Sequence, residues 1–320
     1  MDPISALEKK IKTLSLDDFE IYQIESHDFL AQSNEGKIEF TEESIERGTA
    51  IRLFKGGKIG LGCSSDWSFP FLERMVDQAY NGLSIGDEKQ KFDLPGPLSA
   101  LPRWGGWGGE SGFAPHFEPK HPALPVQGGR ELALVLEREA RAYDPRVRRV
   151  RDARYSGGQT RVVLKNSRGL EAEYSKSTHE VSLMVMAEDK EEREMAWDSD
   201  FSSSLSGIDP VKIGRRVAEK AVSQLGARPI KTQKSAAILD QTVAASFLGV
   251  LSSSFLGDQV QKQRSSLRGR LGQTIYSDQV TLVDDGQLEN GCLTAPFDGE
   301  GAVTRRNELV SHGVLKSFLY

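Results

Sequence analysis

Carboxylates and arginines gather towards the end of the sequence, in a glycine-rich segment that starts at Ser277. The charged residues there are Asp284, Asp285, Asp298, Glu300, Arg305 and Arg306. Carboxylate oxygens are the ligands that magnesium and calcium prefer, but the spacing of these residues matches no EF-hand. The glycines between them are Gly286, Gly291, Gly299 and Gly301. Because glycine reaches positive φ angles at no steric cost, this segment is typical of a functional loop.

Three consecutive serines, Ser252 to Ser254, are the second group of possible nucleophiles. An α/β-hydrolase presents its serine in a G-x-S-x-G turn, and the sequence around these serines has no such turn. The three residues lie inside an apolar stretch with helical spacing. This position favours a closely packed helix over a catalytic serine.

Histidine and cysteine are the usual zinc ligands, and neither is spaced here to bind the ion. No two of the five histidines are four residues apart. His116, Glu118 and His121 are close together, but the proline between them excludes the helix that would bring them onto one face. Cys63 and Cys292 form no CxxC pair, and the small neighbours of Cys63 favour a buried structural thiol. We therefore expect no zinc in this chain.

A basic run of arginines extends from Arg146 to Arg154. It could contact nucleic acid, but Asp144 and Asp152 dilute its charge and no series of stacking aromatic residues accompanies it. The whole chain has a net charge of −5, which gives no attraction to phosphate backbones. We expect a solvated strand or helix end here, and no nucleic-acid partner.

The sequence has no apolar run that approaches the roughly 20 residues of a membrane-spanning helix, and its first residues lack a signal-peptide pattern. Two distant cysteines fit a reducing compartment. We therefore expect a cytoplasmic protein without a membrane partner.

Periodicity in the first quarter of the chain predicts a sheet of hairpins between two helices. Apolar residues at helical spacing predict a helix over residues 4–14. Two hairpins follow, one turning at 34–37 and one at Gly56-Gly57, where glycines supply the φ angles of a tight turn. A second helix over 68–83 should pack on this sheet.

The later part of the chain repeats this pattern. The expected elements are a helix at 130–143, hairpins between 158 and 200 that form a second sheet, a helix at 210–225, and short strands at 236–239 and 280–283. The most apolar helix is expected at 243–260, where Phe247, Leu251 and Phe255 recur every four residues. Such a face lies in a core or at a subunit interface.

These elements predict an α+β fold of two domains, each with an antiparallel sheet of hairpins packed against helices. The first domain is expected at 1–94 and the second at 130–320. An irregular segment at 95–129, rich in proline and glycine, is expected to be a linker or lid.

Several long motifs resemble the TldD/PmbA (TldE) peptidase family, and the PmbA/TldE branch in particular. They are RGTAIRLFKGGKIGLGCSSDWS, YSGGQTRVVLKNSRGLEAEY, AAILDQTVAASFLGVLSSSFLGDQVQKQRSSLRGRLG and VTLVDDGQLENG with the later PFDGEGAVTRR and LVSHGVLKSFLY. Family members extend beyond the point where this chain stops, so the resemblance implies a C-terminally truncated second domain.

The resemblance implies a function. In this family a TldD chain and a PmbA/TldE chain assemble into a cytoplasmic zinc metallopeptidase, a hydrolase that acts on unfolded or precursor peptides. The catalytic chain carries an HExxxH motif, at whose place this sequence has Ser252 to Gly257. The resemblance therefore places the zinc in a TldD-like partner subunit and implies no catalytic residue in this chain.

Two groups of residues have an expected role in such an assembly. Asp298, Glu300, Gly301 and Arg305 would border the peptide channel or the partner chain. Phe247, Leu251 and Phe255 would form an interface helix. The alternative is a non-enzymatic regulatory or binding protein of the DNA gyrase modulator type.

Overall fold

The computed structural model describes residues 3–84, 93–97 and 125–320. Most of the expected linker or lid at 95–129, with His116, Glu118 and His121, lies outside the described residues.

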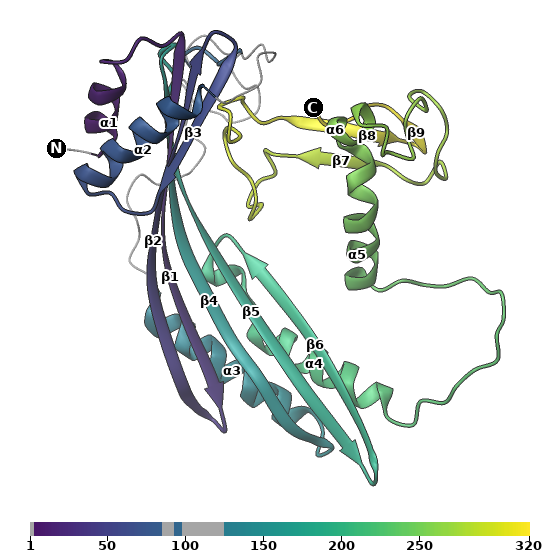
Figure 1. Ribbon diagram of the computed structural model, residues 1–320. Coiled ribbons are helices and arrows are strands. Elements are labelled where there is room, and N and C mark those ends of the chain that lie inside the picture. Colours follow the sequence, from purple (N-terminus) through teal and green to yellow (C-terminus); the bar gives the residue numbers. More distant parts are fainter. Residues whose placement is uncertain (1–2, 85–92, 98–124) are drawn as a thin grey trace, which may run out of the picture. The chain divides into compact units, whose positions relative to one another are not determined.

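The chain divides into two compact units. Unit 1 consists of Met1–Ala227 and Asn290–Val303, and unit 2 of Arg228–Glu289 and Thr304–Tyr320. Each unit combines helices with an antiparallel sheet, which confirms the α+β class (Figure 1).

A six-stranded antiparallel sheet forms the body of unit 1, with the strand order β3-β2-β1-β4-β5-β6. The strands are β1 (Asp18–Asn34), β2 (Lys37–Lys55), β3 (Lys58–Ser64), β4 (Val147–Asn166), β5 (Glu171–Asp189) and β6 (Glu192–Ser202). Gly56 and Gly57 have φ angles of 58° and 75°. These angles confirm the tight turn expected between β2 and β3.

The strands before and after residues 95–129 form one sheet. β1 pairs with β4 from Glu20, opposite Asn166, to Ser33, opposite Ala153. Strands on both sides of 95–129 therefore share one sheet, whereas the sequence predicted two. The alternation of side chains identifies each hairpin, but it does not specify which open edges pair with each other. The chain instead divides after Ala227.

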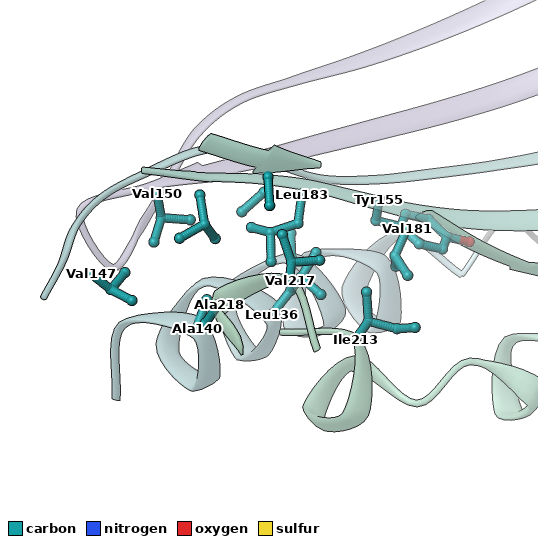
Figure 2. Close-up of a cluster of buried hydrophobic side chains, with 14 of the residues drawn as sticks. Leu136, Ala140, Val147, Val150, Tyr155, Val181, Leu183, Ile213, Val217 and Ala218 are labelled. Carbon is teal, nitrogen blue, oxygen red and sulfur yellow. The ribbon is translucent and has the colours of Figure 1, made fainter. Parts of the chain in front are cut away.

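Helices cover one face of this sheet (Figure 1). They are α1 (Pro3–Ile11), α2 (Phe69–Gly82), α3 (Val126–Tyr143) and α4 (Pro210–Gln224), with a 3-10 turn at Leu205–Gly207. Figure 2 shows Leu136 of α3 and Val217 of α4 packed towards Val181 and Leu183 of β5. Tyr155 in this core and Val163 in the core below α1 and α2 are both odd-numbered residues of β4. Both helix pairs therefore cover the same face, and the even-numbered residues of β4 from Arg154 to Asn166 point to the opposite one. A register shift between Arg151 and Arg154 inverts this order in the outer part of β4, where Val150 is buried below the helices and Arg149 and Arg151 lie on the opposite face.

Unit 2 has its own small core and sheet. Its elements are α5 (Gln241–Ser252), a 3-10 turn at Ser253–Phe255, α6 (Gly257–Gln261), β7 (Leu282–Asp285), β8 (Arg306–Ser311) and β9 (Val314–Leu315). Its hydrophobic core consists of Phe255, Leu267, Leu309, Val310 and Leu315.

In unit 2, three elements differ from those that the sequence predicted. Residues 227–240 form no strand, and β7 begins at Leu282 rather than at 280. The single helix expected at 243–260 is interrupted at Leu256, whose backbone is extended. The cause is a distant contact, since the Gly257 N–H donates to the Leu319 carbonyl at 2.6 Å and the Leu319 N–H to the Phe255 carbonyl at 2.8 Å.

Among the described residues, every helix is too short or too polar to cross a membrane.

Candidate functional site

The segment Asn290–Val303 packs on the sheet face opposite the helices. Its anchor is Phe297, which is 2% exposed and meets the ring of Tyr174 edge-on at a centroid distance of 5.1 Å. Phe297 shares a buried cluster with Val162 and Leu164, two even-numbered residues of β4. Edge-to-face ring contacts contribute about 0.5–1.5 kcal/mol beyond the burial of their area. The segment is therefore held to the sheet by apolar packing.

Asp298 and Gly301 give the segment a tight turn. The Asp298 carboxylate accepts hydrogen bonds from the backbone N–H groups of Glu300 and Ala302, both at 2.9 Å. Gly301 has a φ of 81°, and a Cβ added there would lie 2.9 Å from Cδ2 of Leu164. Positive φ and close packing both require glycine at this position. The Asp298 carboxylate thus stabilises the turn by accepting hydrogen bonds from the backbone of its own loop.

Glu300 is linked to the sheet through Arg52. Arg52 Nη1 donates to Glu300 at 3.0 Å, and its Nε and Nη2 bind the two oxygens of Glu20 at 2.8 and 3.0 Å. The Glu20 side chain is 3% exposed, and this burial raises its pKa, although Arg52 acts in the opposite direction. The arrangement is a bidentate ion pair with a second carboxylate at its exposed edge.

The other charged residues of the glycine-rich segment belong to unit 2. Asp284 accepts from Asn307 at 3.2 Å, Asp285 accepts from the Gln287 N–H at 3.0 Å, and Arg305 is exposed. Of the four residues expected to form one loop, the structure brings Asp298, Glu300 and Gly301 together. Within the described ranges, no group of three histidine, cysteine, aspartate or glutamate side chains could hold a metal ion.

The apolar residues of the expected interface helix have different environments. Phe247 and Leu251 of α5 are 57% and 39% exposed, and no residue of α5 is buried. Phe255 follows α5 and is 2% exposed, in the core of unit 2. Phe255 is thus a core residue of its own unit, while the interface role of Phe247 and Leu251 remains a prediction.

The serines at the end of α5 and in the turn after it do not fit a zinc ion. Ser252 Oγ donates to the Gly249 carbonyl at 2.7 Å and Ser253 Oγ to the Val250 carbonyl at 3.2 Å, as is usual for serine in a helix. Ser254 Oγ contacts Ser266 Oγ at 3.4 Å. Zinc sites use histidine, cysteine and carboxylate side chains, and residues 252–257 supply none of them.

A pocket on the outer part of the sheet was missed by the sequence reasoning. It is lined by Arg149, Arg151, Met184, Met186 and Met195. The basic run that contains the two arginines is a solvated part of β4, as expected. One signal in the sequence could have identified the pocket. In the stretch that became β5 and β6, where apolar and polar residues alternate, methionine occupies three positions on the polar face.

Comparison with known proteins gives the family of this chain. Models described as PmbA/TldA metallopeptidase domain 1, central domain and C-terminal domain match residues 19–82, 119–225 and 232–320. The chain is 25% identical to the metalloprotease PmbA of Escherichia coli O157:H7 over 286 residues, which is 89% of this chain and 61% of that protein. It is 26% identical to a metalloprotease TldD homolog of Haemophilus influenzae over 86% of this chain and 57% of that protein.

Solved structures agree on the fold. The chain superposes on TldE from Thermococcus kodakarensis with a TM-score of 0.79 and 21% identity, over 99% of this chain and 70% of that one. The chain spans about three fifths of the length of its curated relatives. Since the three family models together match most of its residues, the chain belongs to the PmbA/TldD metallopeptidase family.

Proposed function

We propose that this chain is the PmbA/TldE-type subunit of a two-chain zinc peptidase, in which a TldD-like partner holds the zinc and the catalytic residues. The observation that carries the proposal is the composition of α5 and the turn after it. At the place that corresponds to the family's zinc motif, residues 252–257 offer hydroxyl, apolar and glycine groups in place of zinc ligands. The substrates would be unfolded or precursor peptides.

The exposed side of α5 supports a partner interface. Phe247, Val250 and Leu251 are large apolar side chains with 57%, 77% and 39% of their surface exposed. Burying such a side chain fully contributes about 1.5–3 kcal/mol. A partner chain that covers α5 would therefore contribute burial energy that α5 does not gain within this chain. We place the contact with the TldD-like chain on this helix.

The loop of Asp298, Glu300 and Gly301 would border the substrate chamber. Its backbone is fixed by the Asp298 carboxylate and by the buried Phe297, so it presents a constant shape to a passing peptide. Arg305, which is exposed on unit 2, would offer a positive charge to the peptide or to the partner chain. These roles require no metal and no proton transfer by this chain.

Reconstitution tests the proposal. The chain alone should not cleave a quenched fluorescent peptide of unfolded sequence, and it should allow zinc-dependent cleavage when a TldD-like chain of the same source is added. Phe247→Asp with Leu251→Asp should abolish this effect, because a buried unpaired carboxylate is costly at an interface. Ile45→Asp, at a side chain 57% exposed on β2, is the matched control and should leave cleavage intact.

Two results would overturn the proposal. One is zinc-dependent cleavage by the chain alone. The other is an effect on DNA gyrase without any partner, which would favour the regulatory alternative.

A further inference from the structure

The sheet face opposite the helices is covered at one end and exposed at the other. Phe297 packs beside Tyr174 of β5 and covers that end. Met184 lies ten residues further along β5 on the same face, which corresponds to roughly 33 Å of strand. Segment Asn290–Val303 is therefore anchored far from the outer part of this face.

Two rows of paired residues cross the outer part of the face. In the first row Arg149 of β4 is opposite Met186 of β5, which is opposite Met195 of β6. In the second row Arg151 is opposite Met184, which is opposite Trp197. Each row thus begins with a guanidinium and continues with apolar side chains. We call these six residues the arginine–methionine patch.

The patch is concave and exposed. Arg149, Arg151, Met184, Met186 and Met195 line a pocket of about 140 Å³. Met195 and Trp197 have 60% and 52% of their surface exposed, which is unusual for large apolar side chains on a sheet without a partner. Methionine is flexible and polarizable, so such a surface adapts to apolar side chains of different shape.

The positive charges of the patch, those of Arg149 and Arg151, have no ion-pair partner among the described residues. Two carboxylates close to them in the strands pair with other arginines, Glu188 at 3.4 Å from Arg193 and Asp152 at 3.8 Å from Arg154. Two guanidinium groups beside an apolar pocket are complementary to carboxylates that carry apolar neighbours.

We infer that the arginine–methionine patch binds an extended acidic peptide, whose carboxylates pair with Arg149 and Arg151 and whose apolar side chains rest on the methionines and Trp197. Arg149 and Arg151 are two residues apart on one strand, roughly 7 Å, which is also the spacing of alternate side chains in an extended peptide. A peptide that runs between the arginines of β4 and the methionines of β5 directs its alternate side chains to its two sides, so it can place carboxylates on both arginines and the apolar residues between them on the methionines. The inference deepens the proposed function, on which it rests for the peptide's role as a substrate.

Binding by the chain alone tests this inference separately from the subunit proposal. The probe is a short fluorescein-labelled peptide with glutamate at alternate positions and leucine or phenylalanine between them, followed by fluorescence anisotropy. Two comparison peptides carry lysine in place of glutamate, or serine in place of the apolar residues. We expect binding of the first peptide, weakened at least about fivefold for each comparison peptide.

Variants place the binding on the patch. Arg149→Ala with Arg151→Ala should weaken binding by at least about fivefold, since two charge-assisted hydrogen-bond partners are lost. Arg148→Ala is the matched control, because Arg148 belongs to the same basic run but does not line the pocket, and it should leave binding unchanged. Two measurements on the unmodified protein need no variant. Raising the salt concentration should weaken binding, and the bound peptide should protect Met195 from oxidation by hydrogen peroxide.

The inference would be overturned by equal binding of the lysine peptide, by equal effects of the double variant and Arg148→Ala, or by oxidation of Met195 at an unchanged rate. Absence of binding would also overturn it. None of these results would affect the reconstitution of cleavage with a TldD-like chain, so failure of this inference and failure of the proposed function are distinguishable.

Discussion

Arg52 of β2 donates a hydrogen bond from Nη1 to Oε1 of Glu300 at 3.0 Å, although 248 residues separate them along the chain. An exposed ion pair alone contributes about 0.2–1 kcal/mol. Here the pair accompanies the buried Phe297, so segment Asn290–Val303 is held by an apolar and an ionic contact together. The sheet thus fixes the loop that we place beside the substrate chamber.

Gly301→Ala should destabilise unit 1. The left-handed φ of 81° costs a non-glycine residue about 1–2 kcal/mol, and the new Cβ would crowd Leu164 and Leu170. We expect the free energy of unfolding in urea to fall by about 2 kcal/mol or more. Gly299→Ala is the control, since its Cβ would have no atom within 4 Å, and it should cost less than about 1 kcal/mol. Equal losses for the two variants would show that the loop is not docked as described.

Arg52→Met and Glu300→Gln should differ strongly in their effect on stability. Without Arg52, the Glu20 carboxylate is buried and loses its bidentate partner, which typically costs about 3–5 kcal/mol. Glu300 is 73% exposed, so its neutralisation should cost less than about 1 kcal/mol. Chemical denaturation of both variants measures the difference. If Arg52→Met proves as mild as Glu300→Gln, then Glu20 is not the buried partner of Arg52.

Acid should destabilise unit 1 through His179. Its Nδ1 is 2.7 Å from the Tyr155 hydroxyl, and burial lowers the pKa of His179 below its usual 6.5. The neutral ring is thus favoured in the folded protein, so its contribution is fully present above about pH 6.5 and is lost as the pH falls through the folded pKa.

Urea midpoints across this pH range measure the effect. His179→Gln should reduce the dependence of the unfolding free energy on pH, because it removes the titrating group. The control His27→Gln removes a ring that is 38% exposed and should preserve most of the dependence. A steeper loss of stability in His179→Gln would contradict the assignment.

Burial also raises the pKa of Tyr155, to about 12. The folded protein therefore favours the protonated phenol, whose contribution to stability is present below about pH 10 and is lost as the pH rises towards 12. Tyr155→Phe should abolish this alkaline loss. Persistence of the loss in the variant would assign it to other groups.

Cys63 should react with a thiol reagent faster than Cys292. Cys63 is exposed, and partial burial raises the pKa of Cys292, which lowers the fraction of reactive thiolate. Cys63→Ser should remove the fast phase of the reaction with Ellman's reagent, and Cys292→Ser the slow phase. The opposite assignment of the two phases would contradict the register of β3.

The exposure of Cys63 shows where reasoning from sequence ends. The prediction of a buried thiol was wrong, because burial depends on which face of the strand meets the helix. Cys63 is opposite Ala50, which is in turn opposite Tyr22 on the face away from the helices. Its neighbour Gly62 faces α2, where an added Cβ would lie 2.9 Å from Cγ of Met75. Local alternation predicted the strand, but only the tertiary packing selects the buried face.

The candidate site shows the same limit. A glycine-rich loop predicts positive φ angles, and Gly301 has one. The helical spacing of Phe247 and Leu251 predicted α5. The partner of Glu300 was not predictable, because no local pattern connects it with Arg52. The end of α5 was missed for a similar reason, since Leu319 interrupts the helix by pairing with residues 255–257. Long-range pairings of this kind decide which residues form the site.

Zinc analysis of the reconstituted complex tests the central claim most directly. The chain and its TldD-like partner would be mixed, purified by size-exclusion chromatography, and then separated into single chains for metal determination. We expect a complex in which zinc remains with the TldD-like chain, while this chain is metal-free both alone and after separation. Zinc bound to this chain, or failure of the two chains to associate, would contradict its role as a metal-free subunit.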